Sequence, residues 1–289
     1  MKVLITGANG QLGWELQRTV PNEISVLALN SKQLDITNQA NVNQAIQQFQ
    51  PNVIINTAAY TAVDNAEKEQ EKAFAVNATG AGIVAEVAHN YGARIIQIST
   101  DFIFDGKKSS PYLPEDTPNP LGVYGASKLA GEQKVNEASQ YNALVLRTGW
   151  VYSAHGQNFV KTMLRLMNER DEINVVADQV GTPTWAKGLA EAIWKFVELP
   201  DLKGTYHWTD AGVASWYDFA SLIQNEAAML GILEHSVAIC PIRTEDYKTA
   251  AVRPSYSVMD KTKTWSDIPL QPHHWRAGIQ EMLSEITDI

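Results

Sequence analysis

Lys2-Val3-Leu4-Ile5-Thr6-Gly7-Ala8-Asn9-Gly10-Gln11-Leu12-Gly13, near the start of the chain, joins an apolar run to three glycines spaced three residues apart. The apolar run predicts a buried strand, and the amphipathic residues after it predict a helix. At such a junction Gly7 permits a tight turn, Gly10 lets a pyrophosphate approach the backbone, and Gly13 lets the helix pack close to the strand. The free N–H groups at the helix start favour an anion. This stretch therefore predicts a dinucleotide-binding βα unit.

The rest of the first half alternates between the two kinds of element. Strands are predicted over 24–29, 53–57, 94–99 and 143–147, and helices over 11–20, 39–49, 66–90 and 124–138. This alternation predicts an α/β fold with a Rossmann-type doubly wound parallel sheet.

From about Thr148 onward the pattern is less regular, with helices predicted over 159–170, 185–199, 215–230 and 272–286. We expect residues 1–150, with parts of 180–210, to form the dinucleotide-binding domain. Residues 151–180 and 211–289 are expected to form a smaller C-terminal substrate-binding cap.

Composition excludes several classes of protein. The 289 residues are 45% hydrophobic and 19% charged, which is typical of a globular protein. A formal net charge of -9 argues against a nucleic-acid binder. No apolar run approaches the roughly 20 residues that span a bilayer. The single cysteine, Cys240, cannot form an internal disulfide, and the apolar run before Gly7 is too short for a signal peptide. We therefore expect a cytoplasmic enzyme.

The end of the second predicted strand bears on the choice of cofactor. NAD-binding folds usually place a carboxylate there to bind the ribose 2′-hydroxyl. Here the strand runs into Asn30, Ser31 and Lys32, without a carboxylate. Lys32 either faces a 2′-phosphate or lies in solvent, and the first alternative favours NADPH with NADH tolerated. Asp35 and Ile36 follow and are expected to line the adenine pocket.

A tyrosine and a lysine have the spacing of a catalytic pair. Among the 10 tyrosines only Tyr124 has a lysine four residues later, Lys128, and this spacing places both on one helix face. A nearby ammonium is expected to lower the phenol pKa from about 10, so that Tyr124 donates a proton to a ketone while Lys128 holds ribose hydroxyls. A hydroxyl is also needed to polarise the carbonyl. Thr100 is the first choice and Ser99 the second, since both end a predicted strand.

These features together resemble the extended short-chain dehydrogenase/reductases, which act mostly on nucleotide sugars. Five further stretches are similar to the dTDP-4-dehydrorhamnose reductase family: Asn56–Glu67, Ser99–Gly106, Arg147–Tyr152, Asp178–Thr184 and Arg253–Ser257. The resemblance covers nearly the whole chain.

The resemblance implies NAD(P)H-dependent reduction of the 4-keto group of dTDP-6-deoxy-L-lyxo-4-hexulose to dTDP-L-rhamnose. It implies that Thr100, Tyr124 and Lys128 are catalytic, with Tyr124 as the proton donor. Dinucleotide contacts are implied for Gly10, Gln11, Leu12, Asp35, Ile36, Ala58, Ala59 and Tyr60. Contacts with the dTDP-sugar are implied for Thr100, Asp101 and Trp150. Arg253 is a candidate partner for the diphosphate, since a guanidinium grips phosphate bidentately. The alternatives are a core aromatic for Trp150 and an ion-pair member for Arg253.

This chain departs from the resemblance at one position beside Trp150. Many relatives carry serine where it has Gly149, and glycine there removes a side chain and frees the backbone. Some members also bind Mg²⁺ through carboxylates at a subunit interface, which would make the protein a homodimer. Glu191, Glu281 and Glu285 are the candidates here, against the simpler interpretation of solvated helix faces. None of the six histidines has zinc-site spacing.

Other functions share part of this pattern. A nucleotide-sugar dehydratase would need a second carboxylate after Thr100-Asp101, where this chain has Phe102. Another nucleotide-sugar 4-ketoreductase or an epimerase is excluded less firmly. A non-catalytic module, such as the related regulatory subunit of methionine adenosyltransferase, would not require Thr100, Tyr124 and Lys128 together.

Overall fold

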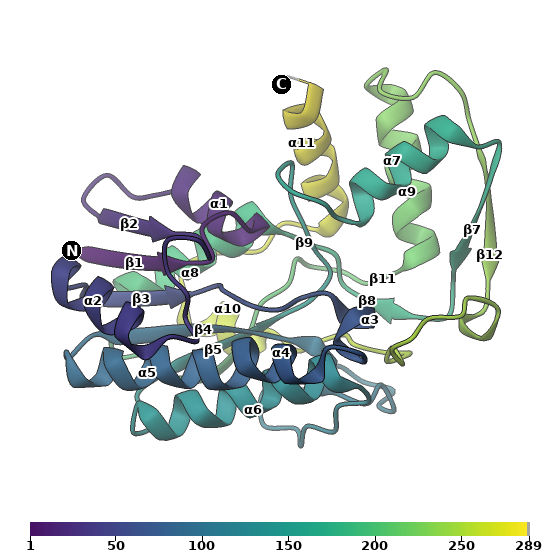
Figure 1. The fold of residues 1–289 in the computed structure, drawn as a ribbon. Helices are drawn as coiled ribbons and strands as arrows, with labels where there is room; N and C mark the ends of the chain where they lie inside the picture. Colours follow the sequence, from purple (N-terminus) through teal and green to yellow (C-terminus); the bar gives the residue numbers. More distant parts are fainter. Residues whose placement is uncertain (288–289) are drawn as a thin grey trace.

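The computed structural model describes residues 1–287, with the side chain of Thr287 left aside, and its core is a six-stranded parallel sheet (Figure 1). In spatial order the strands are β10 (Gly204–His207), β5 (Leu144–Thr148), β4 (Arg94–Thr100), β3 (Val53–Asn56), β1 (Lys2–Thr6) and β2 (Ser25–Leu29). The apolar run at the start of the chain becomes β1, between β3 and β2, because its residues are buried on both faces of the sheet.

Helices cover both faces of this sheet. One face packs against α1 (Gln11–Arg18) and α8 (Ala186–Glu198), with α10 (Thr262–Asp267) beside β10. The other face packs against α2 (Gln39–Phe49), α5 (Ala81–Asn90) and α6 (Val123–Ala138). The predicted α/β fold class with a doubly wound parallel sheet is therefore confirmed.

A second core lies in the C-terminal half. It joins α7 (Phe159–Glu169), α9 (Trp216–Met229) and α11 (Trp275–Thr287) to the parallel pair β7 (Glu172–Val176) and β12 (Ala238–Ile242). Two short pairs connect it to the sheet: β8 (Val180–Gly181) with β11 (Ala214–Ser215), and β6 (Val151–Tyr152) with β9 (Thr184–Trp185). Residues 262–268, inside the predicted cap range, pack on the sheet instead, and the predicted domain boundaries stay a prediction.

The helix predicted over 66–90 is present from Gln70 to Asn90, but it is not regular. Helix α4 (Gln70–Phe74), the π-helix η1 (Ala75–Gly80) and α5 follow one another without a break, and α3 (Val63–Ala66) is a separate turn before them. The wide turn of η1 carries Asn77, whose side chain accepts from the N–H of Tyr60 and donates to the carbonyl of Tyr60 and to Ser127. These bonds tie the loop after β3 to α6. π-Helical turns often occur at such functional positions.

The chain also contains two short 3₁₀ turns, η2 (Asp101–Ile103) and η3 (Thr244–Asp246). Within residues 1–287, no helix combines the length and the apolar composition that crossing a bilayer requires.

Candidate active site

The loop that joins β1 to α1, residues 7–13, is called here the glycine cradle. Gly7 has φ +69, and a Cβ on it would lie 2.8 Å from the backbone nitrogen of Ala58. A Cβ on Gly13 would lie 2.4 Å from the carbonyl oxygen of Gly7. Helix α1 begins after Gly10 without a side-chain cap, so its first N–H groups remain free for an anion. The glycines let the strand, the turn and the helix pack closely, and the free N–H groups of α1 lie at the cavity, so the cradle fits a pyrophosphate.

A cavity of about 690 Å³ extends from the cradle along the carboxyl ends of β1, β3, β4 and β5. Its lining includes most of the predicted contact residues: Gly7, Gly10, Gln11, Leu12, Gly13, Asn30, Asp35, Ile36, Ala58, Ala59, Tyr60, Thr100, Asp101, Tyr124, Lys128 and Trp150. This volume lies in the range of cofactor sites, and the carboxyl edge of the strands is where open α/β sheets bind ligands.

Two predicted residues lie outside this lining. Lys32 is exposed, and its backbone N–H donates to the side chain of Asn30. Arg253 forms an ion pair with Asp64, with 2.6 Å between Nη2 and Oδ2, and this pairing holds the pKa of Asp64 below its usual value. The alternative interpretation of Arg253 as an ion-pair member thus has a specific partner, and its contact with a diphosphate stays a prediction.

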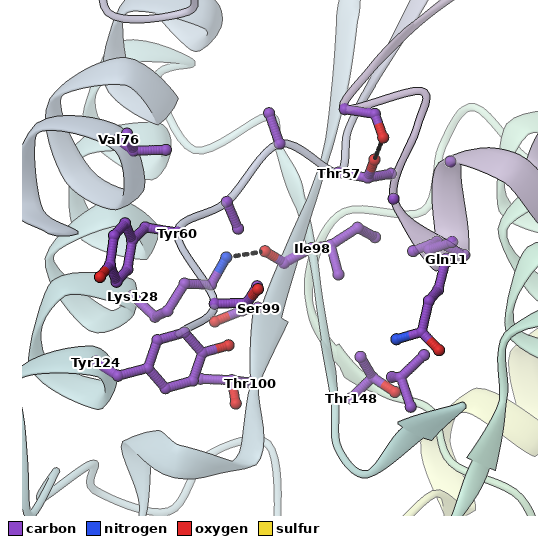
Figure 2. Close-up of a pocket in the computed structure, with 18 of the residues that line it drawn as sticks. Gln11, Thr57, Tyr60, Val76, Ile98, Ser99, Thr100, Tyr124, Lys128 and Thr148 are labelled. Atoms are coloured by element: carbon purple, nitrogen blue, oxygen red, sulfur yellow. Dashed lines mark hydrogen bonds between the residues drawn. The ribbon is translucent and has the colours of Figure 1, made fainter. Parts of the chain in front are cut away.

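Thr100, Tyr124 and Lys128 come together from two elements (Figure 2). Thr100 ends β4, and the other two residues lie on the first turns of α6. A Cβ on Gly125 would lie 2.2 Å from the carbonyl oxygen of Phe102, so glycine there lets α6 approach the end of β4. Lys128 is buried, and its Nζ donates to the carbonyl oxygen of Ile98 at 2.6 Å.

The pKa of Tyr124 moves in the direction opposite to our expectation. Burial raises it to about 12, a hydrogen bond with Thr100 opposes the rise, and the charge of Asp101 adds to it. The expected lowering by Lys128 is wrong, because burial dominates and the ammonium is directed at Ile98. Burial also lowers the pKa of Lys128 to about 8, against the charge of Glu132. Tyr124 is therefore a protonated acid at neutral pH.

Asp101 is buried beside Thr100, whose hydroxyl donates to it at 3.1 Å. Burial raises the pKa of Asp101 to about 6, against hydrogen bonds from Ser257 and Thr100. A Cβ on Gly149 would lie 2.6 Å from the carboxyl carbon of Asp101. The glycine at 149 thus leaves room for this carboxyl group.

Trp150 borders the cavity and is held firmly despite its glycine neighbour. Its φ is +51, a left-handed conformation that costs a non-glycine residue about 1–3 kcal/mol. Its ring stacks on Trp216 with centroids 3.4 Å apart and planes within 2°. A Cβ on Gly181 would lie 2.5 Å from the indole ring of Trp150. Trp150 and Trp216 are together called the aromatic wall.

The model of the RmlD substrate binding domain family matches residues 1–288 of this chain. The chain belongs to that family.

Individual relatives agree with this assignment. A dTDP-4-dehydrorhamnose reductase of Aggregatibacter actinomycetemcomitans is 42% identical, over 97% of this chain and 98% of its own. The spore coat polysaccharide biosynthesis protein SpsK of Bacillus subtilis is 39% identical, over 98% and 97%. A crystal structure of dTDP-4-dehydrorhamnose reductase from Bacillus anthracis in complex with NADP has a TM-score of 0.92 at 41% identity, covering 98% of this chain and 99% of that one. The predicted family is confirmed.

The carboxylates considered for Mg²⁺ do not form a cluster in this RmlD-family chain. Within residues 1–287, no group of three or more histidine, cysteine, aspartate or glutamate side chains could hold a metal ion. The carboxylate of Glu285 accepts from Arg18 at 2.8 and 2.9 Å and forms an ion pair with Lys187 at 3.3 Å. Glu285 is thus an ion-pair member.

Several residues at the site were not predicted from the sequence. Gln157 and Asn158, in the loop before α7, also line the cavity, and Asn158 donates to the side chain of Gln11 at 2.9 Å. Trp216 was expected only as part of a helix. No sequence pattern indicates these contacts, because the partners lie far apart along the chain.

Proposed function

We propose that this chain reduces the 4-keto group of dTDP-6-deoxy-L-lyxo-4-hexulose to give dTDP-L-rhamnose, with NADPH as the cofactor. The observation that carries the proposal is the convergence of Thr100, Tyr124 and Lys128 on the cavity that begins at the glycine cradle. The membership of the RmlD family and the names of its relatives support the substrate class.

The side chains divide the chemistry of a ketone reduction among them. A reduced nicotinamide dinucleotide bound in the cavity supplies the hydride. Tyr124 donates the proton to the carbonyl oxygen, for which a pKa of about 12 keeps it in the acid form. The hydroxyl of Thr100 polarises the same oxygen.

Lys128 would hold the ribose hydroxyls next to the nicotinamide of the bound dinucleotide. The spacing of four residues on α6 places its ammonium on the same helix face as Tyr124. A pKa of about 8 keeps most of the ammonium charged at neutral pH despite burial. Its hydrogen bond to the carbonyl of Ile98 fixes the side chain at the carboxyl edge of β4.

The residues present fit a dinucleotide with a reactive end at Tyr124. The glycine cradle has no side chains where a pyrophosphate would lie, and Asn30, Asp35 and Ile36 line the cavity further along. The use of NADPH rather than NADH is part of the proposal: the NADP complex of the Bacillus anthracis relative and the lack of a carboxylate at the end of β2 support it.

The decisive experiment supplies the purified chain with dTDP-6-deoxy-L-lyxo-4-hexulose and NADPH and follows the nicotinamide absorbance. We expect the absorbance to fall and dTDP-L-rhamnose to appear. Tyr124→Phe should lower kcat at least about 100-fold, since the proton donor is lost, while NADPH binding stays within about twofold. Absence of turnover by the unaltered chain with either NADPH or NADH would refute the proposal.

A further inference from the structure

Thr148 carries a hydroxyl that has no partner in the described part of the chain. It ends β5 and pairs in register with Thr100 of β4. It is 5% exposed, it lines the cavity, and its Oγ1 makes no hydrogen bond to any atom of residues 1–287. An unsatisfied buried hydroxyl is destabilising. Its presence at a ligand cavity indicates that a ligand supplies the missing partner.

Four apolar side chains share this side of the cavity with Thr148. Leu12, Ile98, Val151 and Leu189 line the cavity and belong to the core that α1 and α8 form on this face of the sheet. Strand alternation from the buried Leu146 places Thr148 on the same face.

The amide of Gln11 also lies beside Thr148 (Figure 2). It accepts a hydrogen bond from Asn158 and makes none with the hydroxyl of Thr148. The hydroxyl is thus an unpaired polar group next to apolar side chains.

Figure 2 shows where Thr148 lies relative to the catalytic residues. Thr148 is on the side of Gln11, across the cavity from Tyr124 and Lys128. A dinucleotide whose pyrophosphate lies in the glycine cradle and whose reactive end faces Tyr124 must pass Thr148.

We infer that Thr148 binds the nicotinamide end of the dinucleotide, with its hydroxyl hydrogen-bonded to the carboxamide group. This inference rests on the proposed function and deepens it. A flat ring with one amide substituent matches a group of apolar side chains with an unpaired hydroxyl beside them. A sugar ring presents several hydroxyl groups and would leave most of them unpaired against Leu12, Ile98, Val151 and Leu189.

The test measures binding without the sugar nucleotide, so its result does not depend on turnover. Thr148→Val keeps the shape of the side chain and removes the hydroxyl, while Thr148→Ser keeps the hydroxyl. We expect Thr148→Val to weaken NADPH binding about fivefold to tenfold, as the loss of one hydrogen bond would. Binding of 2′-phospho-ADP-ribose, which lacks nicotinamide, should change less than about twofold. Thr148→Ser should restore most of the NADPH affinity.

Stability separates this role from a structural one. Without ligand, Thr148→Val should be as stable as the unaltered chain or more stable, because an unpaired hydroxyl is replaced by a methyl group. The matched control is Thr264→Val, since the buried hydroxyl of Thr264 donates to the carbonyl of His207 at 2.6 Å outside the cavity. It should lose stability and keep its NADPH affinity.

Two results would overturn the inference. One is an unchanged NADPH affinity in Thr148→Val, and the other is equal weakening of NADPH and 2′-phospho-ADP-ribose. A chain that binds NADPH as expected but does not reduce the ketosugar would refute the proposed function alone and leave this inference standing.

Discussion

The glycine cradle and Trp150 of the aromatic wall line the same cavity, but cradle and wall are built in different ways. The cradle is one continuous stretch of chain, and its shape follows from contacts between residues 7 and 13 together with Ala58. The wall combines Trp150 with Trp216 of α9, and Gly181 leaves room for it. The cradle can therefore be predicted from adjacent residues, whereas the wall exists only once both halves of the chain have folded together.

The largest effect on NADPH binding is expected from a substitution in the glycine cradle. Gly13→Ala places a Cβ 2.4 Å from the carbonyl oxygen of Gly7 and 2.9 Å from Cα of Ala8, so backbone must move. We expect NADPH binding to fall about 100-fold or more, and the free energy of unfolding to fall by about 1–3 kcal/mol from overpacking. Titration with NADPH and denaturant unfolding measure the two effects.

A second glycine in a helix provides the control. A Cβ on Gly188 of α8 would lie 3.7 Å from Oδ1 of Asp210, its nearest neighbour outside the helix, which is an ordinary contact distance. Gly188→Ala should therefore bind NADPH normally and gain about 0.5–1 kcal/mol of stability. Similar losses of NADPH binding in both variants would show that close packing at Gly13 is not what makes the cradle.

Asp101 lines the same cavity and lies against Gly149, next to the aromatic wall, and its charge gives a pH-dependent test. Its pKa in the folded chain, about 6, exceeds the usual value of 3.8, so the folded state binds more protons between these values. Stability from this group is fully present below about pH 4 and is lost as pH rises through 6, to the extent of about 3 kcal/mol. Asp101→Asn removes this dependence.

We therefore expect Asp101→Asn to match the unaltered chain near pH 4 and to be more stable above pH 6, by up to about 3 kcal/mol. Urea unfolding from pH 4 to pH 8 measures the difference. A difference of the same size at every pH would mean that the buried carboxyl group is not the source.

The fold was largely predictable because its signals are local. Strands such as β1 and β4 are apolar runs buried on both faces, and the helices between them are amphipathic. Within the helix predicted over 66–90, the π-helical turn at Ala75–Gly80 was not predicted; it carries Asn77, whose side chain bonds to Tyr60 and Ser127. Those partners are distant in sequence, and no periodicity indicates them.

The site residues also fall into those that local spacing predicts and those that depend on the folded chain. Tyr124 and Lys128 follow from a spacing of four residues, and the glycine cradle from a spacing of three. The partner of Trp150 could not be predicted, nor could the unpaired hydroxyl of Thr148, because both depend on burial in the assembled chain. The direction of the Tyr124 pKa was missed for the same reason, since burial outweighs the charge of a neighbour.

The smallest expected effect comes from a substitution in the aromatic wall. It distinguishes the wall from the cradle because it should change the affinity for the sugar nucleotide and leave the affinity for NADPH unchanged. Trp216 covers one face of Trp150 and donates through Nε1 to the side chain of Gln179 at 3.2 Å. Trp216→Ala should free the ring of Trp150 and raise KM for the sugar nucleotide about tenfold, as the loss of an aromatic pair would. The Kd of NADPH should not change, because the cradle is intact, and Trp216→Phe should recover part of the loss.

Trp265→Phe, at a 42% exposed position on α10, controls for the removal of an indole. A variant that loses affinity for both ligands would mean that cap and cradle are not independent, since the wall would then also support the dinucleotide.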